Sequence, residues 1–231
     1  MENVKQEFTT RVEEINHYFI FLEQINDEKV KILVEDTSIN IENQLPPTLR
    51  ASAILLLYNL LEATAILAID EIHIHISTKT SLLYKDANDA FKKIWIEYKY
   101  NNFNDISSTQ ILDNLQTIEN ERINIFIQNV SSSKYLEKIK GVTFSGKIDA
   151  KQVRTFAIKY GFAENTANKG VDLVQIKNQR NTLAHGEISF TECGNNYGYQ
   201  RLTEMKDNAV SFLQEFLDNI ENYLMEEKYR K

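Results

Sequence analysis

A nearly continuous apolar stretch, from residue 49 to residue 69, most constrains what this chain can fold into. Beyond its first turn, only Asn59, Glu62 and Thr64 strongly interrupt a run made mainly of Ala, Leu and Ile. A membrane span needs about 20 apolar residues, but an asparagine and a glutamate near its middle would be costly in lipid. A helix buried on all sides in a large bundle accommodates the same run. We therefore expect the central helix of a bundle and no membrane span.

The rest of the chain is also predicted to be mostly helical. Only 7 Gly and 2 Pro occur in 231 residues, which leaves little turn chemistry for an all-β or α/β fold. Apolar positions at helical spacing predict further helices over residues 4–26, 86–100, 109–130, 149–160, 166–184 and 202–223. Residues 27–44 are mixed and are expected to extend a helix or form a loop. Residues 187–200, rich in Gly and Asn, are expected to form a loop or a short hairpin.

These patterns predict one all-α domain over residues 1–231, with an insertion at approximately 138–165 and no internal repeat. The only cysteine, Cys193, excludes an internal disulfide framework and any cysteine-rich zinc site. The first residues lack the basic and then apolar pattern of a signal peptide. We therefore expect a soluble, cytoplasmic protein.

The charge of the chain is distributed unevenly. The net charge of −7 argues against general adhesion to nucleic acid. Between Lys134 and His185, however, ten basic residues face four acidic ones, a local surplus of +6 that leaves −13 on the remainder. This distribution indicates a local phosphate-binding site on an otherwise repulsive surface. A solvated basic face is the alternative interpretation.

The basic segment ends in a motif that carries candidate chemistry, Gln179-Arg180-Asn181-Thr182-Leu183-Ala184-His185-Gly186. Arginine grips a phosphate through a fixed fork of donors, and histidine can move protons near neutral pH. Residues five apart on a helix point about 140° from each other, so Arg180 and His185 do not share a face. Asn181 and His185, four apart, do. Either the helix unwinds where Gly186 ends it, or Arg180 meets the imidazole of a second protomer.

Arg180-Asn181-Thr182-Leu183-Ala184-His185 resembles the Arg-polar-x-x-x-His motif of the HEPN superfamily, and the chain is similar in particular to the bacterial MAE-type HEPN-like nucleases. The similarity extends over both halves of the chain. It includes Leu49–Ala63, Phe144–Gly161, and the His185-Gly186-Glu187, Ser189-Phe190 and Glu192-Cys193-Gly194 segments. The resemblance implies an all-helical, metal-independent endoribonuclease without a cofactor. It also implies a homodimer in which both motifs line one cleft, and a toxin or antiviral abortive-infection effector restrained by an antitoxin or another regulatory protein.

On this hypothesis, a ribose 2′-hydroxyl attacks the adjacent phosphate of an RNA substrate, such as a tRNA. His185 acts as general base or acid, Arg180 stabilises the charge on the phosphorane oxygens, and Asn181 holds the phosphate or orients the imidazole. Further residues are expected to contribute indirectly or to bind the substrate. Glu62 is expected to pair with Arg180 or Arg50 inside the bundle, and Lys177, Tyr197 and Tyr199 are candidates for binding RNA.

Other candidates are weaker. His73 and His75 flank Ile74 at a spacing that could bind metal from a strand, but no further Cys or His cluster completes a site. Cys193 has no evident base partner and is not expected to be a nucleophile. The competing functional hypothesis is a non-catalytic HEPN module that uses the same bundle to bind a nucleotide or a protein partner.

Overall fold

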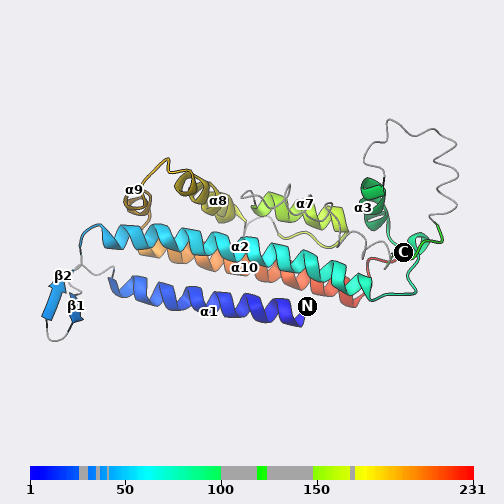
Figure 1. Cartoon of the computed structure of the whole chain (residues 1–231), viewed down its shortest axis with the longest axis horizontal. Helices are drawn as coiled ribbons and strands as arrows, with labels where there is room; N and C mark the ends of the chain where they lie inside the picture. The colour runs from blue at the N-terminus through cyan, green and yellow to red at the C-terminus, as the bar shows by residue number, and fades with distance from the viewer. Residues whose placement is uncertain (26–30, 35–36, 41, 100–118, 124–147, 167–169) are drawn as a thin grey trace.

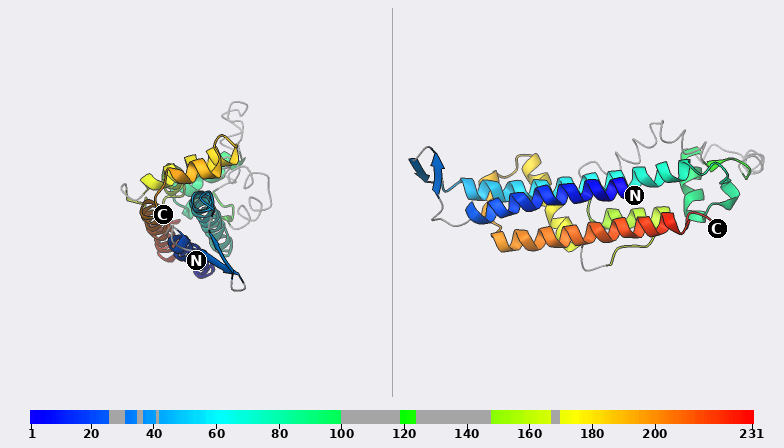
Figure 2. Two further views of the ribbon diagram at one scale, coloured as in Figure 1. Left: turned by 90° about the vertical axis from the view of Figure 1, so that its left-hand side faces the viewer. Right: turned by 90° about the horizontal axis from the view of Figure 1, so that it is seen from below.

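Three long helices run side by side along the long axis of the molecule (Figure 1). The computed structural model describes residues 1–25, 31–34, 37–40, 42–99, 119–123, 148–166 and 170–231. The long helices are α1 (Glu2–Ile25), α2 (Leu45–Ser77) and α10 (Tyr199–Met225). Helices α2 and α10 run in the same direction and α1 runs opposite to both, as the second view in Figure 2 also shows. An ion pair between the amino terminus and Glu71 fixes the start of α1 against the second half of α2.

Helix α2 is the central helix predicted from its apolar stretch. It contacts α1, α8, α9 and α10, and its buried side chains point to all sides (Ala51, Ile54, Leu57, Tyr58, Leu61, Ala65, Ala68 and Ile72). By length and composition alone, it could also cross a membrane. Packing against four other helices explains why this helix is apolar all round, since each side covers part of the core.

Three shorter helices follow one another along one side of α2 (Figure 1). They are α7 (Ala150–Tyr160), α8 (Val171–Ala184) and α9 (Phe190–Asn195). Helix α7 covers the end of α2, where His73 Nε2 lies 2.7 Å from the Tyr160 hydroxyl. Helix α9 covers its start. The candidate motif in α8 lies over the first half of α2, where Arg180 contacts Tyr58. The chain then returns along the bundle as α10.

The all-α class is confirmed, but two short segments differ from their predicted structure. Strands β1 (Lys31–Val34) and β2 (Thr37–Asn40) form an antiparallel hairpin in which Val34 pairs with Thr37, where a helix extension or loop was expected. β-branched residues at alternate positions favour this conformation. The segment after the motif was expected to be a loop or hairpin, but it contains α9. A hydrogen bond from the amide of Glu192 to the Ser189 side chain caps this helix.

The other predicted helices differ from the observed ones mainly at their ends. Helix α3 (Asp89–Lys99) packs against α7, with the short turn η1 (Tyr84–Asp86) before it. The motif helix begins at Val171 rather than at residue 166. Most of the helix predicted over 109–130 lies outside the described residues, as do residues 138–147 of the expected insertion at 138–165. The described part of that insertion is mainly α7, so the insertion stays a prediction.

Candidate active site at the end of α8

Backbone hydrogen bonds around Gly186 terminate helix α8. The amide of Gly186 donates to the carbonyl of Leu183 at 3.1 Å, and the amide of Glu187 donates to that of Thr182 at 3.0 Å. Together these bonds form a Schellman motif, which satisfies carbonyls that have no partner within the helix. Gly186 has φ +69°, a left-handed conformation that glycine adopts without the steric penalty of a Cβ. The sequence prediction that Gly186 ends this helix is confirmed.

Arg180 lies against the central helix, held by two contacts. Its guanidinium carbon is 4.7 Å from the centre of the Tyr58 ring, and its Nη1 donates to Asn181 Oδ1 at 3.1 Å. The Tyr58 hydroxyl in turn lies 3.5 Å from Glu62 Oε1, one turn further along α2. A cation over an aromatic face is attracted by the ring quadrupole. Helix α2 therefore orients Arg180 through Tyr58, while the residue as a whole remains partly exposed.

Burial has the largest effect on the pKa of the Tyr58 hydroxyl. Together with the nearby Glu62 carboxylate, it raises the pKa of the Tyr58 hydroxyl to about 12, although Arg180 acts in the opposite direction. Tyr58 therefore stays neutral near physiological pH. Glu62 was expected to pair with Arg180 or Arg50; it contacts Tyr58 instead, and Tyr58 connects it to Arg180. Since Tyr58 and Glu62 are four apart on a helix, they lie on the same face.

His185 stands at the exposed end of α8. Its backbone amide donates to the carbonyl of Asn181 at 2.9 Å, so the backbone is still helical at this residue. Within the described part of the chain, the imidazole makes no hydrogen bond or ion pair. Arg180 and His185 therefore remain on different faces, as the helical spacing predicts, and the structure shows no unwinding that would bring them together. Asn181 connects them, because its side chain accepts from Arg180 and its carbonyl holds the His185 backbone.

Lys177 takes part in the junction between α7 and α8. Its ammonium pairs with Asp149 at 2.5 Å, and Asp149 also caps α7 by accepting from the amide of Gln152 at 3.0 Å. Burial alone would raise the pKa of Asp149, but the hydrogen bonds from Lys177 and Gln152 outweigh it and lower that pKa. Lys177 is therefore a structural cation in the folded chain. Its expected role in binding RNA stays a prediction.

Arg50 and α9 support the start of α2. Arg50 Nε donates to the carbonyl of Gly194 at 3.0 Å, and Gly194 packs so closely on Pro47 that a Cβ there would lie 1.7 Å from the Pro47 carbonyl oxygen. Arg50 thus anchors α9, which follows directly after the motif.

The two tyrosines proposed to stack on RNA bases lie close to the bundle. Tyr197 is buried, and its hydroxyl accepts from Gln175 Nε2 at 3.0 Å. Tyr199 is partly buried, with its ring centre 6.5 Å from that of Phe19. Both therefore pack within the folded chain, and their binding of RNA bases stays a prediction.

The remaining candidates have ordinary structural environments. His73 and His75 lie on α2 rather than on a strand, where a separation of two residues places their rings on different sides of the helix. No group of three or more potential metal ligands occurs within the described ranges. Cys193 is buried and its Sγ lies 3.5 Å from Gln179 Oε1; burial raises the pKa of this thiol and disfavours the thiolate.

Sequence reasoning missed the part played by Tyr58, whose ring lies against the Arg180 guanidinium. The signal was available, because a tyrosine hydroxyl and a glutamate carboxylate four apart in an apolar helix each need a polar partner. It also missed Asp172 on α8, which pairs with Arg201 and accepts from Asn208 Nδ2 at 2.7 Å. These contacts fix α8 against α10.

The chain is a helical bundle in which Arg180 and His185 lie at the end of α8. The model of the HEPN_MAE_28990-like HEPN family matches residues 1–229, and the chain therefore belongs to this family. HEPN-type domains are generally associated with ribonuclease or nucleotide-binding roles. Comparison with curated proteins and with solved structures found no match.

Proposed function

We propose that this protein is a metal-independent endoribonuclease in which Arg180 and His185 act on the phosphodiester that is cut. The observation that carries the proposal is the end of α8, where a partly exposed arginine and an exposed histidine flank Asn181. The first can hold a phosphate and the second can move a proton. Membership of a HEPN-type family supports the same function.

The reaction needs no nucleophile from the protein, because the ribose 2′-hydroxyl attacks the adjacent phosphorus. His185 removes the 2′-hydroxyl proton as general base, or donates a proton to the departing 5′-oxygen as general acid. Arg180 stabilises the negative charge that builds on the non-bridging oxygens of the phosphorane. The products are a 2′,3′-cyclic phosphate and a free 5′-hydroxyl. Asn181 positions the Arg180 guanidinium through its side-chain oxygen.

The geometry favours a homodimer. Arg180 leans toward α2 through Tyr58, whereas His185 is exposed and about 140° away around the helix. A two-fold axis near the end of α8 would bring Arg180 of one copy to His185 of its partner, since a two-fold interface joins the same surface of both subunits. The cleft lined by both motifs would then contain two complete arginine and histidine pairs.

The expected biological role is that of a toxin or antiviral abortive-infection effector acting on RNA in the cytoplasm. An enzyme that cuts cellular RNA must be restrained until it is needed, so an antitoxin or another regulatory protein is the expected partner. Structured RNA such as tRNA is the expected substrate class. The net charge of −7 disfavours indiscriminate binding to nucleic acid.

Incubation of the purified protein with total RNA in EDTA tests this function. We expect cleavage that leaves 2′,3′-cyclic phosphate ends, and none by a folded His185→Ala variant. A Lys93→Ala variant, altered on the exposed surface of α3, is the matched control and should cut like wild type. Intact RNA after incubation with folded, dimeric wild-type protein would favour the non-catalytic module that binds a nucleotide or a protein partner.

A further inference from the structure

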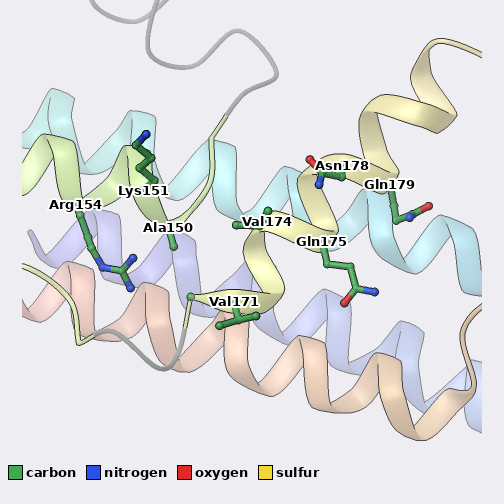
Figure 3. Close-up of a pocket in the computed structure, with 9 residues that line it drawn as sticks. Ala150, Lys151, Arg154, Val171, Val174, Gln175, Asn178 and Gln179 are labelled. Atoms are coloured by element: carbon green, nitrogen blue, oxygen red, sulfur yellow. The ribbon is translucent and has the colours of Figure 1, made fainter.

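A hollow of about 490 Å³ lies between the start of α7 and the outer face of α8 (Figure 3). Ala150, Val171 and Val174 contribute apolar surface, and two cations from α7, Lys151 and Arg154, line it beside them. None of the nine described residues that line the hollow is acidic. The hollow is therefore cationic and partly apolar, a combination that complements a phosphate joined to a flat base.

Several lining groups are available to a ligand. The side chains of Lys151 and Asn178 are exposed and make no hydrogen bond or ion pair with any other residue that the structure describes. Val171 is 72% exposed and Val174 is 40% exposed, so apolar surface faces solvent here. Arg154 has structural contacts, since it donates to the carbonyls of Asn165 and Thr166 at 3.3 Å. The part of the hollow that a ligand can reach is thus formed by Lys151, Asn178 and the two valines.

The hollow shares a helix face with His185. Val171, Val174, Asn178 and His185 follow one another at spacings of three, four and seven residues, which places all four on the outer side of α8. At 1.5 Å per residue, Val174 lies about 16 Å along the helix from His185. A strand cut at His185 would have to extend by several nucleotides to reach the hollow.

We propose that this hollow binds a nucleotide in a single-stranded segment of the RNA substrate, away from the cleaved bond, with a base against Val171 and Val174 and a phosphate at Lys151. Asn178 can both donate to and accept from a base edge. This inference rests on the proposed ribonuclease function and adds a second point of attachment. The motif cuts the strand, and the hollow selects substrates long enough to reach it.

The affinity for RNA is measured first, in a variant that lacks the proposed catalytic histidine. The His185→Ala protein is titrated with a fluorescent single-stranded oligonucleotide of about ten nucleotides at several salt concentrations. Adding Lys151→Glu should lower the affinity about tenfold, whereas Lys93→Glu, the same charge change on the exposed surface of α3, should alter it less than twofold. Lys151→Ala should reduce the slope of log affinity against log salt by about 0.7, the value for one lost phosphate contact with a single strand.

Equal losses from Lys151→Glu and Lys93→Glu would overturn the site, because they would reflect net charge alone. Weaker self-association with unchanged RNA affinity would overturn it as well, and would assign this face to contact between two copies.

An assay of RNA cleavage distinguishes failure of this binding site from failure of the proposed ribonuclease function on which it rests. If the protein cuts RNA, Lys151→Glu should reduce kcat/KM for the long oligonucleotide but not for a dinucleotide. If it cuts nothing, the function fails, and the binding comparison still decides the site.

Discussion

Arg180 combines a role in packing with the proposed role in chemistry. Its guanidinium lies over the ring of the fully buried Tyr58, and it also donates to Asn181. A planar guanidinium can lie on a ring and still direct donors toward a phosphate, whereas an ammonium is a compact point charge. The orientation of this residue should therefore matter as much as its charge.

We expect Arg180→Lys to keep the fold and lose most of the activity. The substitution preserves the positive charge but removes the fork that would hold the phosphorane oxygens. Loss of one such donor typically reduces kcat by about 10² to 10³. Arg11→Lys, on α1 in an ion pair with Glu7, is the control and should cut RNA at the wild-type rate. A fully active Arg180→Lys protein would show that charge alone is sufficient.

At the scale of elements, one side chain connects α7 to α8. Asp149 both caps α7 and pairs with Lys177 of α8. Asp149→Ala removes the cap and the ion pair, and we expect it to lower the free energy of unfolding by about 1–3 kcal/mol. Asp149→Asn retains a capping oxygen and removes only the charge, so it should lose less. Chemical denaturation of the two variants at neutral pH measures the difference.

The contribution of Asp149 should also depend on pH. Its pKa is lowered in the folded protein, so the stabilisation is complete above the unfolded pKa of about 3.9. It is lost as the pH falls through the folded pKa, where the carboxylate becomes protonated. The stability gap between wild type and Asp149→Asn should therefore shrink below about pH 4. A gap that stayed constant down to pH 2 would contradict the ion pair with Lys177.

Helix α9 provides a second test at the level of elements. Gly194→Ala would place a methyl group against the carbonyl oxygen of Pro47, so α9 must move away from α2. We expect a loss of about 1–3 kcal/mol, typical of overpacking. Gly198→Ala is the matched control, because nothing lies within 4 Å of its added Cβ. Equal melting temperatures for the two variants would show that the start of α2 tolerates the displacement.

For the whole molecule, the sequence predicted the elements that carry a strong local signal. The apolar run of α2, the helical spacing over residues 149–160 and the stop at Gly186 each lead to one local structure, and all three are observed. The hairpin of β1 and β2 and the helix α9 were not predicted. Both are short, so local propensity competes there with tertiary packing.

The candidate site was only partly predictable for a similar reason. Helical spacing placed Arg180 and His185 on different faces, and the structure retains that arrangement. The contact of Arg180 with Tyr58 joins residues more than 100 positions apart, and no local pattern encodes it. The environments of Lys177 and Tyr197 likewise depend on tertiary partners, Asp149 and Gln175.

The central claim is that two copies combine Arg180 of one with His185 of the other into a nuclease site. The most direct measurement mixes the inactive Arg180→Ala and His185→Ala proteins under conditions of subunit exchange and assays RNA cleavage in EDTA. A mixed dimer retains one of its two arginine and histidine pairs, and random exchange makes about half of the dimers mixed, so about a quarter of wild-type activity should be restored. No restoration in a mixture shown to contain mixed dimers would contradict the shared site.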